Sequence, residues 1–417
     1  MSEKEVRRGG VLARVEAGEV TQVEAAAILG LSYRQTKRLW KQYQQGGAAG
    51  LVHGNAGKAS NRAIDAKVRR RALKLVRKNY QGPGAAFGPT LAAEHLREDH
   101  GIAVDAETLR RWMLAEGLWQ RERKRKAYRQ RRKRRAHFGE LVQMDGSFEA
   151  WFEERGPRGC LVSMVDDATS RGVARIGAEE TTWAVAETMR SWVEKYGIPR
   201  ALYVDWKNVY HHAPSEKQKQ QGISPVSQFG RMCAKLGTEL IGAHSPQAKG
   251  RVERSHGTHQ DRLIKKMRLK KISSYEVANR YLEEDYLPKH NARYAVGPAE
   301  TVDFHEPVPQ HMNLDDVFCL EEERKVSNDW VVQYGPRWFQ IAEEPHVPAG
   351  STILVRQRRD GTIRLVWQQV ELQWRELQER PKNPEPAKPA KREQRPNIPS
   401  ANHPWRAYSK PDRSLQC

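Results

Sequence analysis

The chain of 417 residues carries 72 lysines and arginines against 51 aspartates and glutamates, a formal net charge of +21 at pH 7. This excess predicts a polyanionic partner, and the length is enough for several folded domains. The sequence shows no apolar run long enough for a membrane span and no apolar signal-peptide core, and its four cysteines are scattered. We therefore expect a cytoplasmic protein with no membrane partner, no disulfide framework and no cysteine-rich zinc site.

Residues 21–47 predict two short helices joined by a glycine-containing turn. Gly30 breaks the first helix, and Ser32 is placed to cap the second. This pattern is typical of a helix-turn-helix, whose second helix enters the major groove. The alternative is an ordinary helical hairpin with a solvated basic face. We assign residues 1–60 to a helix-turn-helix DNA-binding unit, in which the predicted DNA contacts are Arg34, Gln35, Lys37, Arg38 and Lys41.

A second helical unit is predicted over residues 61–120. One helix spans 62–80, and a helical hairpin follows over 88–119, whose second helix begins at Asp105 or Glu107. Two tandem units would bind a longer DNA site than one. The acidic content of the second unit makes direct contact with bases the weaker interpretation for it.

Residues 121–137 form a basic linker, and 11 of the 15 residues from 121 to 135 are lysine or arginine. A solvated charge run is the simpler interpretation. A block this dense repels itself unless an anion neutralises it, which favours contact with backbone phosphates. The phosphate contacts predicted here are Arg123, Lys124, Arg125, Arg131 and Arg132.

From residue 138 to 300 the pattern predicts one α/β domain in the order β-β-β-α-β-α-β-α. Such an order gives a mixed sheet covered by helices, in which the first and fourth strands can be neighbours. Short strands return over 301–378, with an Asp-Gly turn signal at 359–361, and predict a small β-barrel. Its Arg356, Arg358 and Arg364 are candidate DNA contacts, and an interaction-only module is the alternative. Residues 379–417 read as a basic, proline-rich, disordered tail.

Three acids in the central domain stand out by position. Asp145 lies in the first strand, Asp205 ends the fourth, and Glu253 lies at the start of the last helix. Carboxylates without clustered cysteine or histidine favour Mg²⁺ or Mn²⁺, and two such ions support phosphoryl displacement. Each acid taken alone is better explained as a surface residue or cap, and only the set of three favours a catalytic site. Of the other acids, Asp167 with Thr169 is expected to form a turn, and Asp166 to support the ligands.

The segments "QMDGSFEAWFEERGP", "VDDATSR", "ALYVDWKNVY" and "HSPQAKGRVERSHGTHQDRL" resemble DDE transposases of bacterial insertion sequences, of the ISNCY type, which have a retroviral-integrase-like catalytic core. The resemblance implies an RNase H-like fold and a catalytic, metal-binding triad of Asp145, Asp205 and Glu253. It also implies two Mg²⁺ ions, for which Mn²⁺ substitutes, and cleavage at inverted-repeat transposon ends followed by joining to target DNA. The partners would be both DNAs and further copies of the chain, at least a dimer, at the nucleoid. No small-molecule substrate is expected.

The chain departs from the integrase pattern in two respects. Asp205 and Glu253 are 48 positions apart, more than in integrase cores, and we interpret residues 211–228 as a surface insertion. Helix-turn-helix units replace the His/Cys module of retroviral integrases, so no zinc is expected. Trp206 also stands where related sequences tend to have a smaller or basic residue.

Cations and polar residues surround Glu253. Lys249, Arg251 and Arg254 are expected to bind DNA phosphates near the scissile bond. His244 and Gln247 are placed to orient the scissile phosphate or attacking water, with loop hydrogen bonding as the alternative. Two other functions stay open, a catalytically silent sequence-specific DNA-binding regulator and a metal-dependent nuclease that does not join.

Overall fold

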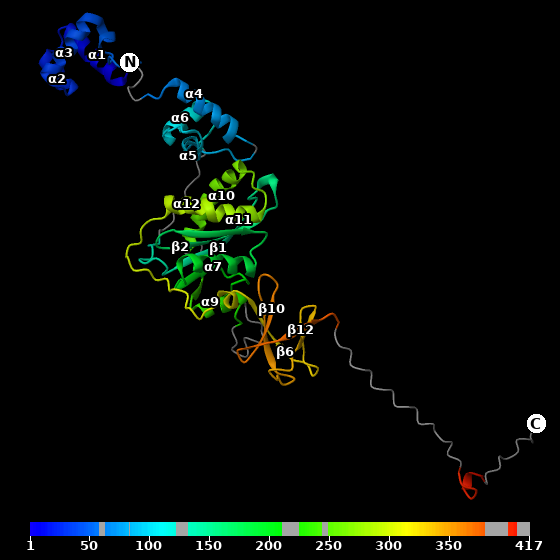
Figure 1. Ribbon diagram of the computed structural model, residues 1–417. Helices are drawn as coiled ribbons and strands as arrows, with labels where there is room; N and C mark the ends of the chain where they lie inside the picture. The colour runs from blue at the N-terminus through cyan, green and yellow to red at the C-terminus, as the bar shows by residue number, and fades with distance from the viewer. Residues whose placement is uncertain are drawn as a thin grey trace, which may run out of the picture. The chain divides into compact units, whose positions relative to one another are not determined.

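The computed structural model describes residues 1–57, 63–82, 84–121, 132–210, 225–243, 249–379 and 399–406. They fall into two units, Met1–Lys124 and Arg125–Cys417 (Figure 1). Most of the 211–228 insertion, the 379–417 tail and the basic linker lies outside the described residues. Across the described ranges, no helix is long and apolar enough to cross a membrane.

Three helices at the amino terminus pack around the buried Leu12. They are α1 (Glu3–Glu16), α2 (Gln22–Leu29) and α3 (Tyr33–Gly46), followed by the 3-10 turn η1 (Gly47–Leu51). Helix α2 ends at Gly30, whose φ of 62° is left-handed, and α3 begins at Ser32, whose hydroxyl accepts a hydrogen bond from the amide of Gln35. The predicted helix-turn-helix is therefore confirmed in its helices and its turn, and α1 is an addition that the sequence analysis did not predict.

The second helical segment contains α4 (Ala66–Leu75), the π-turn η2 (Val76–Tyr80), α5 (Pro89–His100) and α6 (Ala106–Ala115). Its core includes Tyr80 and Phe87, whose rings stack with centroids 4.9 Å apart. Asp105 caps α6, because its carboxylate accepts hydrogen bonds from the amides of Glu107 and Thr108. Of the two acids predicted to open this helix, Asp105 is therefore the cap.

A five-stranded mixed sheet forms the centre of the second unit, in the order β3-β2-β1-β4-β5. Its strands are β1 (Val142–Glu149), β2 (Gly159–Asp166), β3 (Gly172–Gly177), β4 (Ala201–Val204) and β5 (Glu239–Gly242). Strand β1 is antiparallel to β2 and parallel to β4, and β4 is parallel to β5. The predicted order of elements and the pairing of the first and fourth strands are confirmed.

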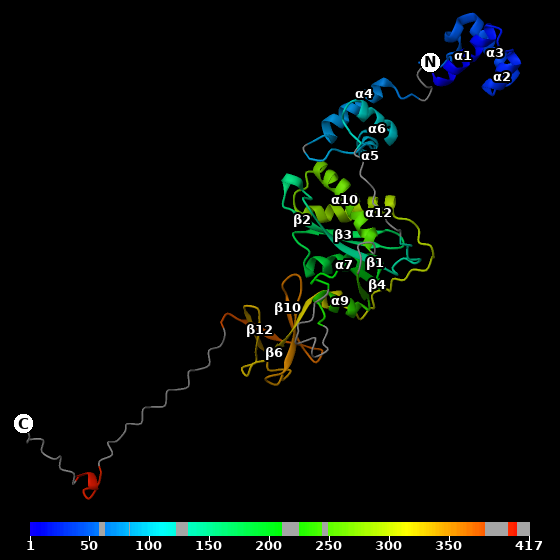
Figure 2. The same cartoon turned by 180° about the vertical axis from the view of Figure 1, so that it is seen from behind.

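Helices cover both faces of this sheet (Figures 1 and 2). Helices α7 (Thr182–Tyr196) and α9 (Gln228–Leu236) bury one face, in a core that includes Val142, Met144 and Trp192. Helices α10 (Gly250–Leu269), α11 (Tyr275–Tyr281) and α12 (Leu287–Tyr294), with the π-turn η5 (Leu282–Tyr286), bury the other face against Leu161 and Ile176. The 3-10 turn η3 (Glu153–Arg155) lies between β1 and β2.

The carboxyl-terminal strands form two sheets around one apolar core. One sheet has the order β11-β10-β9-β6 and the other β12-β8-β7. The strands are β6 (Leu320–Lys325), β7 (Val331–Tyr334), β8 (Arg337–Ile341), β9 (Thr352–Gln357), β10 (Ile363–Trp367), β11 (Val370–Leu372) and β12 (Trp374–Leu377). The Asp-Gly turn joins β9 to β10 as predicted, with Gly361 at a φ of 85°. Within the described strands no closed barrel is found, because hydrogen bonding does not join the two sheets.

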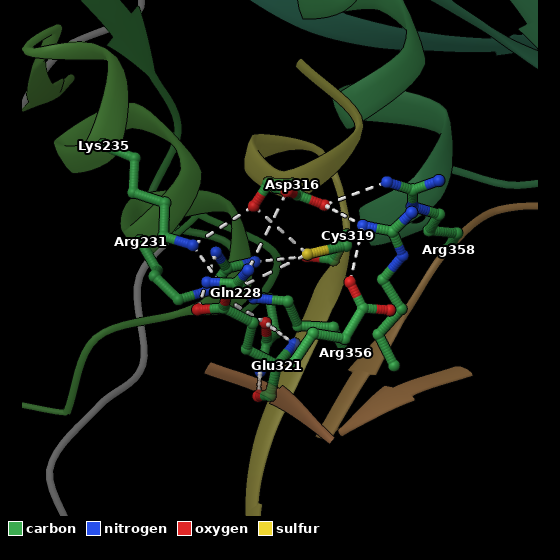
Figure 3. Close-up of polar contacts among 10 residues, drawn as sticks. Gln228, Arg231, Lys235, Asp316, Cys319, Glu321, Arg356 and Arg358 are labelled. Carbon is green, nitrogen blue, oxygen red and sulfur yellow. Dashed lines mark hydrogen bonds and ion pairs between the residues drawn. The ribbon is translucent and has the colours of Figure 1, made fainter. Parts of the chain in front are cut away.

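A buried carboxylate connects this module to the α/β domain (Figure 3). Glu321 of β6 accepts hydrogen bonds from Lys235 of α9 at 2.6 Å and from Arg356 of β9 at 2.8 Å. It also pairs with Arg231 of α9 at 3.1 Å. Burial alone would raise the pKa of Glu321, but these cations outweigh burial and lower it. Beside it, the short helix α13 (Leu314–Val317) supplies Asp316, which accepts from Arg358 at 3.0 Å.

Candidate active site

One face of β1 supplies three polar side chains to helix α10. Val142 and Met144 point into the core with α7 and α9, so the alternating residues Gln143, Asp145 and Ser147 lie on the opposite face. The Gln143 carbonyl oxygen accepts hydrogen bonds from the amides of Arg251 and Val252, each at 3.2 Å. Farther along, Ser147 accepts one from Gln260 at 3.1 Å. Asp145 is thus fixed between two attachments of α10 to the sheet.

Asp145 and Asp205 converge on one cationic group, the ammonium of Lys249. The parallel pairing of β1 and β4 places Asp205, which directly follows β4, beside Asp145. Lys249 Nζ lies 3.0 Å from Asp145 Oδ1 and 2.7 Å from Asp205 Oδ1. The Lys249 side chain is only 5% exposed, whereas that of Asp205 is 37% exposed. The two carboxylates thus form a cation site that opens to solvent on the side of Asp205.

Glu253 lies in the first turn of α10, next to this pair but turned to solvent. Lys249 precedes it by four residues and His256 follows it by three, so the three residues share one side of the helix. His256 Nδ1 is 3.9 Å from Asp145 Oδ2, which shows that this side of α10 faces Asp145. In the described part of the chain, Glu253 makes no ion pair, and no three His, Cys, Asp or Glu residues group closely enough to hold a metal ion. The structure therefore brings together two of the three predicted acids and places the third on the adjoining helix side.

Burial governs the charge of His256. It lowers the pKa of this imidazole, and the Lys249 ammonium lowers it further, against the opposing effect of Asp145. His256 is therefore neutral near pH 7 and adds no cation to the site.

A buried fourth acid, Glu180, lies beside the aspartates, and the sequence analysis missed it. Its carboxylate accepts hydrogen bonds from Lys207 Nζ and from the Tyr210 hydroxyl, both at 2.7 Å. Burial would lower the pKa of Lys207, but Glu180, Asp145 and Asp205 outweigh it and raise that pKa. Lys207 therefore stays charged beside the aspartates. In the sequence, Lys207 could have been linked to this site by its position two residues after Asp205. No local pattern in the sequence marks Glu180.

Two neighbouring acids differ from their predicted roles. Asp166, rather than Asp167, forms the turn with Thr169, because its Oδ1 accepts from the Thr169 amide at 2.6 Å and hydroxyl at 2.7 Å. Burial raises the pKa of Asp166, although these hydrogen bonds oppose it. Asp167 is fully buried and instead binds the end of the basic linker through Arg132 and the Arg135 amide. The turn was assigned to the wrong member of the pair because both acids precede Thr169 closely enough to cap it.

The predicted DNA contacts fall into three groups. The five residues on α3 are exposed, namely Arg34, Gln35, Lys37, Arg38 and Lys41. In the core, Arg254 is exposed, Arg251 is mostly buried, and Lys249 is engaged by the two aspartates. In the linker, Arg132 is exposed and binds Asp167, whereas Arg123, Lys124, Arg125 and Arg131 lie outside the described residues. His244 and Gln247, which were predicted to orient the scissile phosphate or the attacking water, also lie outside them.

Three arginines of the carboxyl-terminal module face acids of the same chain. Arg356 pairs with Glu321, Arg358 with Asp316, and Arg364 lies 3.3 Å from Glu371. These ion pairs favour a structural role, and contact with DNA stays a prediction for this module.

Trp206, the departure noted after Asp205, lies over the backbone of β5. A Cβ atom added at Gly242 would come within 2.6 Å of its ring. Gly242 therefore lets the indole lie close to the sheet, at the edge of the aspartate pair.

Comparisons with known proteins bear on both units. A family model described as a helix-turn-helix domain matches residues 7–59. A protein of Sinorhizobium fredii named as a transposase, y4bF, is 38% identical over 90% of this chain and 81% of its own length. The transposase for insertion sequence IS1202 of Streptococcus pneumoniae is 28% identical over 97% of this chain and 94% of its own.

Solved structures are similar only loosely. The HTLV-2 integrase catalytic core domain in complex with magnesium gives a TM-score of 0.27 at 15% identity, covering 35% of this chain and 83% of that one. A chain of a simian T-cell lymphotropic virus intasome, solved in complex with the PP2A regulatory subunit B56 gamma, gives a TM-score of 0.31 at 13% identity. The match covers 66% of this chain and 91% of that one.

Proposed function

Because this chain belongs to the insertion-sequence transposases, we propose that Asp145, Asp205 and Glu253 form its catalytic triad. The chain is a DNA transposase of the DDE class, a polynucleotidyl transferase with a helix-turn-helix DNA-binding domain.

The observation that carries the proposal is the convergence of Asp145 and Asp205 on one cation, Lys249 Nζ, at 3.0 and 2.7 Å. Carboxylate oxygens arranged around one point suit a hard divalent ion, so the residues fit the metal that the family implies. Two Mg²⁺ ions, or Mn²⁺ in their place, would supply the charge that activates the attacking oxygen and stabilises the leaving one. No zinc is required by this set of oxygen donors.

Glu253 would complete the site by a change of side-chain conformation. It lies between Lys249 and His256 on the side of α10 that faces Asp145, so its carboxylate can turn inward when Lys249 withdraws. The released Lys249 ammonium would then bind a DNA phosphate, together with Arg251 and Arg254. His244 and Gln247 would orient the scissile phosphate or the attacking water.

The reaction would proceed in two balanced steps. A water oxygen attacks the phosphorus at the transposon end, and the bond to the 3′-oxygen breaks, leaving a 3′-hydroxyl. That hydroxyl then attacks a phosphodiester of target DNA, forming one linkage as another breaks. Each step exchanges one bond to phosphorus for another, so no external energy source is needed.

The remaining parts of the chain would hold the two DNAs. Residues 1–60 and 61–120 would bind the terminal inverted repeats, and 121–137 the adjoining phosphates. Residues 138–300 would form the RNase H-like core, 301–378 the module that contains the two small sheets, and 379–417 a basic tail. Because two ends must be held together, we propose that at least a dimer assembles on DNA.

A cleavage and joining assay on the element's own ends separates this function from its alternatives. Wild type should nick at the end and join the 3′-hydroxyl to target DNA in Mg²⁺, and Asp145→Asn should bind the ends and do neither. Nicking without joining of a supplied 3′-hydroxyl end would favour the nuclease. Binding without nicking by wild type would favour the regulator.

A further inference from the structure

The buried carboxylate of Asp167 joins three segments that are distant in the sequence. Its Oδ1 accepts a hydrogen bond from Gln143 Nε2 at 2.8 Å and one from Arg132, and its Oδ2 accepts from the Arg135 amide at 2.8 Å. Asp167 is fully buried, and a buried charge is tolerated only when it is paired and hydrogen-bonded. These contacts therefore hold the end of the basic linker firmly against the core.

Gln143 extends this attachment to helix α10. Its amide nitrogen donates to Asp167, while its carbonyl oxygen accepts from the amides of Arg251 and Val252. These amides belong to the first turn of α10, where backbone donors have no partner within the helix. Lys249, the residue that caps α10, offers no side-chain hydrogen bond to them. Gln143 thus caps the helix from a neighbouring strand.

Arg251, in the first turn of α10, contacts both the linker end and Asp167. Its guanidinium donates to the carbonyl oxygen of Arg132 at 3.3 Å, and its Nε lies 3.4 Å from Asp167 Oδ1. The linker end and the first turn of α10 therefore contact each other as well as the same acid. Arg132, Arg134 and Arg254 surround Arg251, so this corner carries more positive charge than Asp167 neutralises.

We propose that Gln143 and Asp167 are positioning residues, which couple DNA bound by the basic linker to the placement of Glu253. Glu253 directly follows the two amides that Gln143 holds, so a shift of the linker end is transmitted to it through Asp167 and Gln143. A displacement of about 1 Å is enough to lower a catalytic rate by about two orders of magnitude. The inference rests on the proposed catalytic role of Glu253.

Two matched pairs of variants test the coupling in the full chain. Gln143→Met removes both hydrogen-bonding functions at similar volume. Gln260→Met removes a hydrogen bond from α10 to Ser147 of β1, farther along the helix. Arg132→Ala removes a cation that binds Asp167. Lys133→Ala removes the adjacent exposed cation, which has no ion pair to an acid in the described part of the chain. Thermal unfolding checks that each variant is folded.

The main measurement is hydrogen–deuterium exchange of peptides covering 249–256, with and without DNA bearing the element's ends. Wild type and Gln260→Met should gain protection there when DNA binds, and Gln143→Met should not, although it binds the ends within about twofold of wild type. Arg132→Ala and Lys133→Ala should weaken DNA binding equally. Only Arg132→Ala should fail to gain protection at 249–256 when DNA binds. At saturating DNA, Gln143→Met should cleave about tenfold more slowly.

The coupling is refuted if folded Gln143→Met and Arg132→Ala keep the full gain of protection at 249–256. Arg132→Ala alone settles the question if Gln143→Met does not fold. Failure of the proposed function is a separate outcome, in which wild type gains protection on binding DNA but neither cuts nor joins it.

Discussion

At the scale of single residues, the central feature is a lysine ammonium held between two aspartates. Lys249 Nζ offsets part of the negative charge of Asp145 and Asp205, which would otherwise repel each other at short range. A divalent cation at this site must therefore displace Lys249. In the proposed mechanism the ammonium would compete with the metal and, once displaced, would be available to DNA.

Replacement of Lys249 by methionine should tighten divalent cation binding. Without the competing ammonium, the aspartates gain more from a bound ion, and we expect Mn²⁺ affinity to rise about tenfold or more, equivalent to at least ~1.4 kcal/mol. Isothermal titration calorimetry with Mn²⁺ measures this directly. Lys265→Met is the control, because Lys265 lies on the same helix but pairs with Asp261. Unchanged Mn²⁺ affinity in Lys249→Met would contradict competition.

His290 should make the fold sensitive to acid. Burial, with the charges of Arg262 and Lys266, lowers its pKa from 6.5 to about 4. Between pH 6.5 and pH 4 the unfolded chain binds a proton at His290 that the folded chain excludes. The contribution of His290 to the free energy of unfolding is therefore fully present above pH 6.5 and is lost as pH drops toward 4. The loss from this residue is about 3 kcal/mol.

Urea denaturation between pH 7 and pH 4.5 measures this effect. His290→Gln should lose less stability on acidification than wild type, whereas His311→Gln, at an exposed position, should follow wild type. An equally steep loss in His290→Gln would assign the acid sensitivity to other groups.

At the scale of elements, the sequence predicted helices and strands well because their signals are local. Gly30 and Ser32 determine the turn of the helix-turn-helix, and apolar periodicity gave the order of the central domain. The pairing of β1 with β4, which brings Asp145 to Asp205, followed from that order.

Contacts between distant side chains could not be predicted in the same way. Glu180 has no motif around it, and its partnership with Lys207 exists only after the sheet forms. The same holds for Gln143, which looks like an ordinary strand residue until α10 packs on it. Lys249 was predicted from its motif to bind DNA phosphates, but its pairing with both aspartates depends on the start of α10.

Helix α3 should supply base-specific affinity. Arg34 lies exposed in its first turn, the part of a recognition helix that contacts base edges. Arg34→Ala should weaken binding to the element's ends by about 1–3 kcal/mol, and binding to unrelated DNA by less. Fluorescence anisotropy with both DNAs at one salt concentration measures the two losses. Arg14→Ala on α1 is the control. If Arg34→Ala weakens binding to both DNAs equally, Arg34 contacts phosphates and does not recognise bases.

At the scale of the whole molecule, Glu321 fastens the carboxyl-terminal module to the core. Its carboxylate is shared by two cations of α9 and one of β9 (Figure 3). Removing the acid leaves three cations without their shared counter-charge. The ion pairs of this one buried carboxylate therefore add to the other contacts that hold the module beside the core, such as the hydrogen bond from Arg231 to the carbonyl oxygen of Cys319.

Glu321→Gln should destabilise the second unit by about 3 kcal/mol, the usual cost of breaking a buried ion pair. Glu323→Gln is the matched control, because Glu323 is exposed on the same strand. Chemical denaturation followed by tryptophan fluorescence measures both. A loss no larger than in the control would show that the other contacts between the module and the core are enough to hold it.

The central claim is that Glu253 completes an active site with Asp145 and Asp205. Its most direct test is Mg²⁺-dependent nicking and joining of DNA bearing the element's own ends, with wild type, Glu253→Gln and the control Glu276→Gln side by side. Glu253→Gln keeps the size of the side chain and removes its charge. We predict that it binds the ends like wild type but neither cuts nor joins them, while Glu276→Gln does both. Activity of Glu253→Gln equal to wild type would make Glu253 a surface acid of α10 and contradict the triad.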